Sequence, residues 1–312
     1  VNCFSTQPAL NYGFANITDA GWQQPTDAPG PMATREELKN IMRFWLTLGC
    51  DGFRVDMAGS LVKNDEDKKE TIRLWQDVRA FLNKEFPEAA LVSEWGKPEV
   101  ALEAGFDMDF YLHFGDTGYM DLFRGDHPYF GGDPESDISV FAGIFAKNQE
   151  NLRGKGMMCM PSGNHDMARI SYQLDEEQLR LAYGFIYGFP GAPFLYYGDE
   201  IGMQGYRDPF NRAYFDWNST ERRLRVPLSN LARLRRNCDA FDGGSMELVE
   251  ASADVLHYRR VGKEQSAEII LNNGPHLIVR TAFGKQTEVN PGGFTILVED
   301  NQPQHVGYFK YY

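Results

Sequence analysis

The chain has 312 residues, of which 42% are hydrophobic and 24% charged, so it can bury one large domain or a large domain with a smaller one. Its formal net charge is −13, because 44 acidic residues outweigh 31 basic ones. This balance argues against nucleic acid or an anionic membrane surface as a partner. No apolar run approaches the ~20 residues of a membrane helix, and no signal peptide is visible, which leaves the cellular compartment open.

The first 30 residues are rich in Pro, Gly, Asn and Thr and show little periodicity, so residues 1–30 are predicted to be a loop or linker. Thr34 and Glu37 have the spacing of a capping box and predict a helix that begins there. Apolar residues at helical spacing continue this pattern to Leu48, and Gly49 offers a stop.

Strand and helix patterns then alternate as far as residue 241, which predicts parallel strands joined by helical crossovers. The predicted strands cover 52–56, 89–94, 108–113, 157–161 and 193–197. The predicted helices lie around 72–82, 98–104, 138–152, 176–187 and 227–236. Residues 31–241 are therefore expected to form one α/β domain.

After residue 241 the pattern changes to short apolar runs between Gly, Asn and Pro turns. These runs cover 255–259, 269–271, 277–279 and 294–298. They predict a small antiparallel β domain over residues 242–312.

Arg54 and Asp56 end the first predicted strand. Residues two apart in a strand share a face, so the two side chains are expected to point the same way. A neighbouring arginine favours the ionised form of an aspartate, and an ionised carboxylate at a strand end is what a covalent nucleophile requires. A structural ion pair that ends the strand would give the same pattern.

Two further carboxylates follow predicted strands. Glu94 ends the second strand and precedes Trp95, and apolar surroundings would keep its carboxyl protonated, as a general acid needs. A solvent-exposed glutamate is the alternative. His165 and Asp166 follow the strand 157–161, where they could bind a polar substrate and stabilise developing positive charge. An ordinary turn is the alternative there.

Taken together, Asp56, Glu94 and Asp166 end three strands of one parallel βα series. In such folds the active site lies at the carboxyl ends of the strands. Cleavage of a glycoside needs two carboxyl groups about the scissile bond, one as nucleophile or base and one as acid. The three positions therefore fit the needs of a glycosidase, and a neutral sugar is compatible with the acidic chain.

Four segments resemble consecutive signature segments of the α-amylase family of retaining glycoside hydrolases: GFRVDMA, SEWG, GNHDMAR and GAPFLYYGDEIGM. They occur in the order of the family and at comparable spacings, within a stretch from about Gln7 to Gly202. The resemblance implies that residues 31–241 form a partial (β/α)8 TIM barrel. It also implies that residues 242–312 form the small β-sandwich domain that follows the barrel.

The resemblance also implies roles for individual residues. Asp56 would be the nucleophile, Glu94 the general acid/base and Asp166 the transition-state stabiliser, while Arg54 and His165 would bind substrate and tune the centre. The implied substrates are α-linked glucans such as starch or maltooligosaccharides, and hydrolysis and transglycosylation are both open. No cofactor is expected to be required. Calcium is possible, but the region of the family that often holds it has no counterpart here.

The residues themselves predict no metal site. The four cysteines, Cys3, Cys50, Cys159 and Cys238, lack paired spacing and are expected to be scattered core residues. Asp107 and Asp109 lack a further convergent ligand and are expected to be surface carboxylates. Six aromatic residues could stack on sugar rings, but core or loop packing is the expected role of each: Trp95, Phe106, Tyr119, Tyr206, Tyr214 and Trp217.

The resemblance is incomplete. Five βα units cannot close a barrel that has eight strands in ~250 residues, and no counterpart of an earlier signature segment of the family precedes Asp56. We expect an N-terminally incomplete fragment of a longer enzyme, or a chain that associates with another to cover the exposed barrel edge. The chain alone is expected to be inactive or severely weakened on maltooligosaccharides.

Two other classes of function are compatible with the same scaffold. A non-catalytic carbohydrate-binding relative is the main alternative, although such a protein should have lost at least one of the three carboxylates. A metal-dependent βα-barrel enzyme is the second. It needs converging ligands at several strand ends, and only His165 with Asp166 suggests them.

Overall fold

The computed structural model describes residues 6, 8–112, 118–152 and 155–301. The chain divides into two compact units, one of residues 1–110 and 148–158 and the other of residues 111–147 and 159–312. Each unit is described by itself below. Cys3, Gln7 and His113, which carry parts of the sequence-based predictions, lie outside the described residues.

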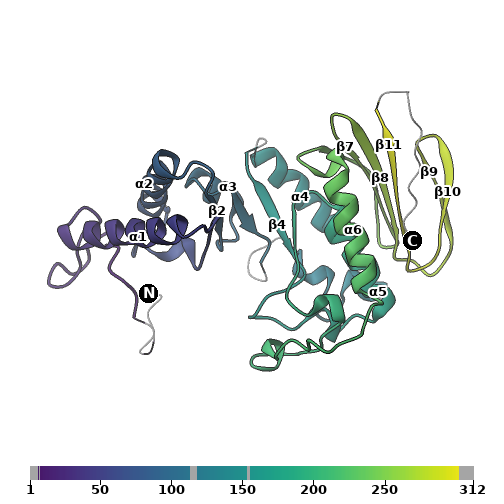
Figure 1. Cartoon of the computed structure of the whole chain (residues 1–312), viewed down its shortest axis with the longest axis horizontal. Coiled ribbons are helices and arrows are strands. Elements are labelled where there is room, and N and C mark those ends of the chain that lie inside the picture. The colour runs from purple at the N-terminus through teal and green to yellow at the C-terminus, as the bar shows by residue number, and fades with distance from the viewer. Residues whose placement is uncertain (1–5, 7, 113–117, 153–154, 302–312) are drawn as a thin grey trace. The chain divides into compact units, whose positions relative to one another are not determined.

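Five short strands alternate with helices along the chain (Figure 1), and within each unit the strands pair in parallel, which confirms the predicted α/β class. They are β1 (Gly52–Val55), β2 (Ala90–Ser93), β3 (Met108–Phe110), β4 (Met157–Pro161) and β5 (Ala192–Phe194). In the first unit β1 pairs with β2 and β2 with β3, while in the second unit β4 pairs with β5. Neighbouring strands that are connected by a helical crossover run parallel in this way.

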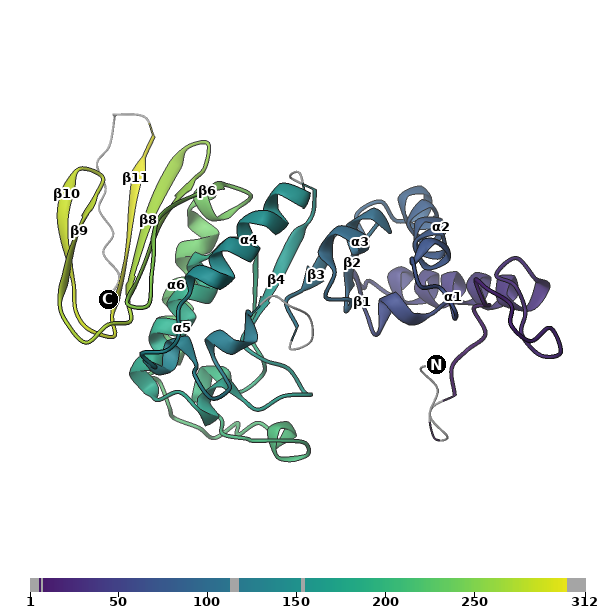
Figure 2. The ribbon, with the colours of Figure 1, turned by 180° about the vertical axis from the view of Figure 1, so that it is seen from behind.

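Six α-helices accompany these strands in the described part of the chain. They are α1 (Pro29–Thr47), α2 (Lys69–Glu85), α3 (Pro98–Glu103), α4 (Ser139–Leu152), α5 (Glu176–Gly188) and α6 (Arg225–Asn237). The helices α1 and α2 lie beside each other in the first unit, and α5 and α6 in the second (Figure 2). None of the described helices is long and apolar enough to cross a membrane.

The predicted capping box is wrong. Helix α1 begins at Pro29, inside the segment predicted to be a loop, and proline is well suited to the first turn of a helix because it has no N–H to leave unpaired. Thr34 lies within the helix, where its hydroxyl donates to the carbonyl of Gly30 (3.2 Å) instead of capping an N-terminus. A true capping box occurs at α5, where Asp175 and Gln178 each accept a hydrogen bond from the other's backbone N–H.

The core of the first unit surrounds Trp75 of α2. Its indole N–H donates to the carbonyl of Ala58 (3.0 Å), which fixes the segment that follows β1. Leu74, Val78 and Leu91 are fully buried around it, and burial stabilises a side chain of this size by ~1.5–3 kcal/mol. The segment after β1 and the strand β2 are therefore anchored on the apolar core of the first unit.

One face of α1 is apolar but exposed. Ile41, Phe44, Trp45 and Leu48 follow one another at helical spacing, and each is exposed, whereas Met42 and Leu46 on the other side are buried. Strand β1 stands at the end of the sheet order, so its far edge is not paired within the described sheet. The first unit thus presents an apolar helix face together with an open strand edge.

The second unit contains a core built from aromatic rings. Rings of Phe123 and Phe130 stack with centroids 5.3 Å apart, and Phe145 meets Phe189 edge to face at 4.6 Å. Pairs of this kind add ~0.5–1.5 kcal/mol beyond the burial of their area. The same core includes the buried rings of Tyr119, Phe141, Phe185 and Tyr258.

The chain ends in antiparallel sheets, as predicted (Figure 2). A four-stranded sheet has the order β11 (Phe294–Asp300), β8 (Gln265–Asn272), β7 (Val255–Val261) and β6 (Ser245–Ala251), and β9 (Ile278–Ala282) pairs with β10 (Lys285–Val289). The sequence reading missed β6 and β10. These strands are largely exposed and carry few consecutive apolar residues, so they lack the pattern that marked the others.

Two glycines bring this sheet close to α5. A Cβ at Gly184 would lie 2.9 Å from the ring of Phe294 in β11, and a Cβ at Gly188 would lie 2.7 Å from the hydroxyl of Tyr258 in β7. Both distances are shorter than real Cβ contacts allow. The α5 backbone therefore packs directly against side chains of the sheet.

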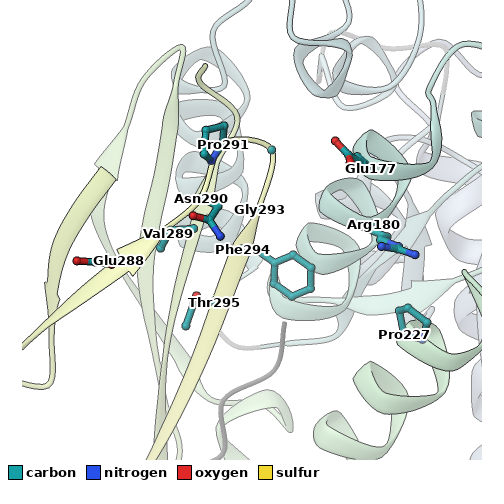
Figure 3. A pocket seen from close by; sticks show the side chains of 11 residues that line it. Glu177, Arg180, Pro227, Glu288, Val289, Asn290, Pro291, Gly293, Phe294 and Thr295 are labelled. Carbon is teal, nitrogen blue, oxygen red and sulfur yellow. The ribbon is translucent and has the colours of Figure 1, made fainter. Parts of the chain in front are cut away.

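A pocket of about 290 Å³ opens in the second unit between the first turns of α5 and α6 and the turn that joins β10 to β11 (Figure 3). Phe294, Pro227 and Pro291 form apolar walls, and Glu177 and Arg180 add charge. None of the predicted site residues lines it. The pocket is therefore separate from the carboxylates described below.

The contact between β1 and β2 leads to a first prediction. Gly52 lies opposite Ala90, and a Cβ at Gly52 would lie 2.1 Å from the Ala90 carbonyl oxygen. Because this neighbour is backbone and cannot rotate away, Gly52→Ala should lower the free energy of unfolding by about 1–3 kcal/mol, measured by urea denaturation.

A matched control uses a glycine with free space. A Cβ at Gly143 of α4 would meet nothing within 4 Å, so Gly143→Ala should leave stability unchanged or raise it by up to ~1 kcal/mol. Equal stability of Gly52→Ala and Gly143→Ala would contradict the tight pairing of β1 with β2.

Candidate active site

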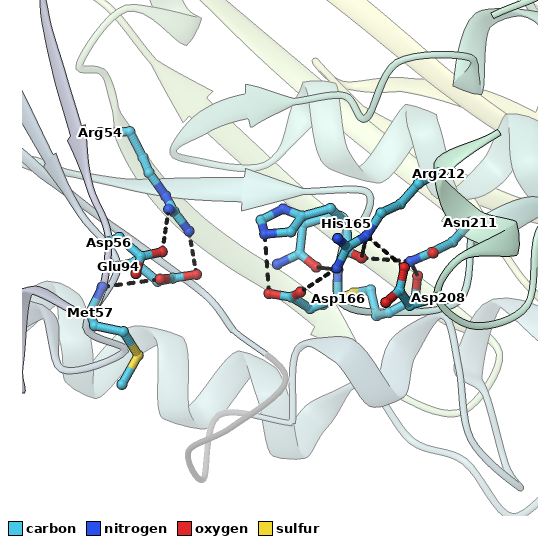
Figure 4. Close-up of polar contacts among 11 residues, drawn as sticks. Arg54, Asp56, Met57, Glu94, His165, Asp166, Asp208, Asn211 and Arg212 are labelled. Atoms are coloured by element: carbon cyan, nitrogen blue, oxygen red, sulfur yellow. Dashed lines mark hydrogen bonds and ion pairs between the residues drawn. The ribbon is translucent and has the colours of Figure 1, made fainter. Parts of the chain in front are cut away.

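In the first unit, Arg54, Asp56 and Glu94 are brought together (Figure 4). Arg54 Nη1 lies 2.8 Å from Asp56 Oδ1, and Arg54 Nη2 forms an ion pair with Glu94 Oε1. The other oxygen of Glu94 accepts a hydrogen bond from the N–H of Met57 (3.2 Å). A single guanidinium therefore contacts both carboxylates.

The parallel register explains this meeting. Arg54 lies opposite Val92, so the residue two places beyond each of them, Asp56 and Glu94, falls on the same face of the sheet. The Asp56 side chain is 73% exposed, whereas that of Glu94 is 8% exposed. Glu94 is thus buried, and its polar partners are the guanidinium of Arg54 and the N–H of Met57.

The backbone turns sharply after Asp56. Met57 adopts a left-handed conformation, with φ of 46° and ψ of 40°, which costs a residue with a side chain roughly 1–2 kcal/mol. This turn aims the N–H of Met57 at Glu94. Strained backbone of this kind is often found at functional sites, where surrounding structure holds it in place.

Asp109 in β3 is fully buried, so its prediction as a surface carboxylate was wrong. Its Oδ1 accepts hydrogen bonds from the Ser93 hydroxyl (2.8 Å) and from the N–H groups of Trp95 (3.0 Å) and Gly96 (3.3 Å). Burial raises the pKa of Asp109, although these hydrogen bonds act in the opposite direction. Asp109 therefore holds the residues on both sides of Glu94.

In the second unit, His165 and Asp166 lie together on the loop after β4. His165 Nε2 is 3.3 Å from Asp166 Oδ2, and both side chains are partly exposed. Asn164 accepts a hydrogen bond from the N–H of Asp166 through its side-chain oxygen (2.9 Å), which tightens the loop. The other carboxylate oxygen, Asp166 Oδ1, lies 3.2 Å from Arg212 Nη2.

Arg124 holds the two ends of this loop. Its Nη2 donates to the carbonyl of Ser162 (2.5 Å) and its Nε to the carbonyl of Ala168 (2.7 Å). A Cβ at Gly163 would lie 2.6 Å from Arg124 Nη2, so a glycine is needed there for the arginine to reach the loop. Burial lowers the pKa of Arg124 to about 10, so its guanidinium stays charged at neutral pH.

A buried carboxyl supports the start of the same loop. The Ser162 hydroxyl donates to Asp199, which also accepts a hydrogen bond from the N–H of Tyr196 (3.1 Å). Asp199 is buried, and this burial raises its pKa to about 6, even though the hydrogen bonds from Ser162 and Tyr196 act to lower it. Asp199 follows β5, so it links two strand ends of the second unit.

The remaining candidates divide by burial. Trp95, Phe106 and Tyr119 are buried, as expected for core residues, whereas Tyr206, Tyr214 and Trp217 are exposed. Cys159 and Cys238 are buried, but Cys50 lies exposed in the loop before β1, so it is not a core residue.

The described residues contain no group of three or more His, Cys, Asp or Glu that could hold a metal ion. Asp107, one of the carboxylates considered for metal binding, pairs with Arg79 Nη2 (2.5 Å) and accepts a hydrogen bond from Leu91 N–H (2.8 Å). Asp109 accepts the three hydrogen bonds described above. Both aspartates thus accept hydrogen bonds from groups of the protein itself.

Residues 30–236 match the model of the alpha amylase catalytic domain, which is well over half of the chain. The chain belongs to the alpha-amylase family. This match confirms the family resemblance that was inferred from the four sequence segments.

Among curated relatives, neopullulanase 2 of Thermoactinomyces vulgaris is 28% identical over 257 residues, which cover 77% of this chain and 40% of that protein. Alpha-amylase 3 of Dictyoglomus thermophilum is 29% identical over 199 residues, which cover 59% of this chain and 36% of that protein. This alpha-amylase family chain thus matches about two fifths of the length of these relatives.

Solved structures share the fold. The ligand-free cyclic alpha-maltosyl-(1→6)-maltose hydrolase of Arthrobacter globiformis has a TM-score of 0.74 at 21% identity, covering 92% of this chain and 67% of that one. The alpha-amylase from H. orenii has a TM-score of 0.71 at 19% identity, covering 89% of this chain and 66% of that one. At such identities the likeness establishes the architecture alone.

Sequence reasoning missed the residues that hold the carboxylates in place: Asp109, Arg124, Asp199, Asn211 and Arg212. Asp199 lies within one of the recognised segments, so that segment could have pointed to it. Asp109 lies within β3, Asn211 and Arg212 lie in a short 3-10 helix (Phe210–Arg212), and Arg124 lies in a loop. None of the four has a distinctive spacing. Only the folded chain shows that they reach the carboxylate loops.

The buried carboxyl of Asp199 leads to a second prediction. A folded-state pKa of about 6 lies above the ordinary value of 3.8, so the folded chain binds more protons than the unfolded chain between these values. The contribution of Asp199 to the free energy of unfolding should therefore fall as pH rises from about 4 to about 6, by on the order of 2–3 kcal/mol.

Asp199→Asn keeps an acceptor for Ser162 and Tyr196 but cannot ionise. We expect the stability of the wild type relative to this variant to fall over that pH window, measured by urea denaturation of both proteins at a series of pH values. An unchanged pH profile in the variant would show that Asp199 is not the group responsible.

Proposed function

We propose that this protein is a retaining α-glycosidase that acts on α-linked glucans or oligosaccharides. The observation that carries the proposal is the contact of one guanidinium, Arg54, with both Asp56 and Glu94. The two carboxyl groups of a retaining glycosidase stand about 5–5.5 Å apart, and carboxylates bound to the two terminal nitrogens of one guanidinium are held at short range. Family membership supports the same chemistry.

In the proposed first step, Glu94 donates a proton to the glycosidic oxygen while a carboxylate oxygen of Asp56 attacks the anomeric carbon. The bond to the leaving sugar breaks and an ester to Asp56 forms. In the second step, Glu94 takes a proton from water, the water oxygen attacks the anomeric carbon, and the ester breaks to return the Asp56 carboxylate. The configuration is retained because the carbon is inverted twice.

Asp166 and His165, in the second unit, have proposed roles in the same reaction. The transition states carry positive charge on the sugar ring, which the carboxylate of Asp166 would stabilise. His165 would donate a hydrogen bond to a sugar hydroxyl. The exposure of both side chains and the hold of Arg124 on their loop support this role. No cofactor is required by these steps.

The names of the relatives support α-glucans as the substrate class. They include a neopullulanase, a cyclomaltodextrinase and a 4-alpha-glucanotransferase. Hydrolysis and transfer differ only in whether water or a sugar hydroxyl takes the glycosyl group from Asp56. The proposal therefore covers both acceptors.

The proposed chemistry is tested by trapping the ester. A mechanism-based glycosyl fluoride should lose fluoride and form a stable ester with Asp56 in the complete product of the gene that encodes this chain. Peptide mass spectrometry should find one label, on Asp56, and none in Asp56→Asn. Absence of label in that complete product, with intact binding of maltooligosaccharides, would instead support the non-catalytic binding relative.

The open edge of the first unit is a proposed association surface. The apolar stripe of α1 and the unpaired edge of β1 together fit the strand and helix of another βα layer, which would cover both. Neither feature is explained by packing inside the described first unit. A layer of the same kind from a second copy is the occupant that can be tested directly.

Sedimentation velocity of this chain should show self-association that grows with concentration. Leu48→Lys should weaken it at least tenfold, because a charge replaces an apolar contact worth about 1.4 kcal/mol or more. Val140→Lys is the control, since Val140 in α4 is 65% exposed, as is Leu48. Equal effects of the two substitutions, or a chain that stays monomeric at every concentration, would count against this surface.

A further inference from the structure

Arg212 contacts three oxygen atoms around the loop that carries Asp166 (Figure 4). Its Nη2 lies 3.2 Å from Asp166 Oδ1, its Nε donates to the carbonyl of His165 (3.0 Å), and Nε also lies 3.1 Å from Asp208 Oδ1. The guanidinium therefore touches the backbone of one residue of the loop and the side chain of the next.

The neighbouring residue strengthens this attachment. Asn211 is buried, and its Nδ2 donates to the carbonyls of His165 (2.8 Å) and Met167 (2.9 Å), on either side of Asp166. The carbonyl of Gly205 accepts a hydrogen bond from the N–H of Arg169 (2.9 Å), just beyond the loop. The segment 205–212 thus binds the loop on both sides of Asp166.

Arg212 and His165 divide the two oxygens of Asp166 between them. Oδ1 faces Arg212 and Oδ2 faces His165 Nε2 at 3.3 Å, so the plane of the carboxylate is set from two sides. An ordinary exposed ion pair contributes little, at ~0–1 kcal/mol. The bond from Nε to the His165 carbonyl distinguishes this pair, because it fixes the guanidinium relative to the loop itself.

We propose that Arg212 is the positioning residue that orients the carboxylate of Asp166 toward the sugar. The inference rests on the proposed function, in which Asp166 stabilises positive charge in the transition state. Because such stabilisation depends on where the charge stands before reaction, loss of Arg212 should slow formation of the ester at Asp56 more than it weakens binding of the sugar.

The first experiment measures the rate constant for labelling by the glycosyl fluoride as a function of its concentration, in the complete gene product. Arg212→Gln should lower the maximal rate constant at least tenfold and change the half-saturating concentration less than threefold. Arg212→Lys should recover part of the rate, because an ammonium keeps the positive charge beside Asp166 but lacks the rigid fork by which the guanidinium also binds the His165 carbonyl. A maximal rate constant equal to that of the wild type in Arg212→Gln would overturn the proposal.

Arg180→Gln is the matched control. Arg180 in α5 forms an ion pair with Glu176 (2.6 Å) and a long hydrogen bond to the carbonyl of Arg223 (3.4 Å), and it is 42% exposed, against 43% for Arg212. Loss of an exposed ion pair alone should leave the labelling rate unchanged. A slowing in Arg180→Gln as large as in Arg212→Gln would show a general effect on the fold and would overturn the proposal.

A second experiment needs no turnover, so it separates this inference from the proposed function. Hydrogen exchange of the Arg212 Nε–H is followed by NMR in protein with 15N-labelled arginine and no sugar. Exchange should be at least tenfold slower than in free arginine, and Asp166→Ala should accelerate it. If the wild type takes no label, the proposed function fails. In that case, slow exchange still supports the proposal that Arg212 holds Asp166. Exchange as fast as in free arginine overturns that proposal.

Discussion

The contact of Arg54 with Asp56 and Glu94 is the interaction on which the chemistry of the first unit depends. Two carboxylates at the ends of neighbouring strands repel each other, and the repulsion is larger where water is excluded. The guanidinium of Arg54 contacts both carboxylates and offsets that repulsion. The close pairing of β1 with β2, which Gly52 permits, determines that all three side chains share one face.

In the second unit, the position of the Asp166 carboxylate is determined in a different way. Asp166 lies on a loop, not directly after a strand, so no register determines its position. Instead, Arg124 binds the two ends of the loop and Asn211 binds the carbonyls within it. Residues on loops need such supporting hydrogen bonds to reach the accuracy that strands provide through their own pairing. The two units therefore hold their carboxylates by different physical means.

Much of this could be read from the sequence because it follows from local pattern. The spacing of Arg54 and Asp56 in a strand predicted a shared face, and the alternation of strands with helices predicted the parallel sheet. The capping box at Thr34 failed because Pro29 begins the helix earlier. Asp109 was misplaced because its partners, the N–H groups after Glu94, come from a different strand, and no single-strand pattern records them. The residues around Asp166 were missed for the same reason, since Arg124 and Arg212 are distant from it in the chain.

The glycines of α5 have a consequence for how the C-terminal sheet behaves. At Gly184 and Gly188 the helix backbone meets Phe294 and Tyr258 with no side chain of its own between them. Any residue larger than glycine at either position would have to displace the side chain of the sheet that it meets. The sheet and the α5 backbone are therefore packed in direct contact. A chain that ended before β7 would lose Tyr258, whose ring packs against Phe189 in the aromatic core.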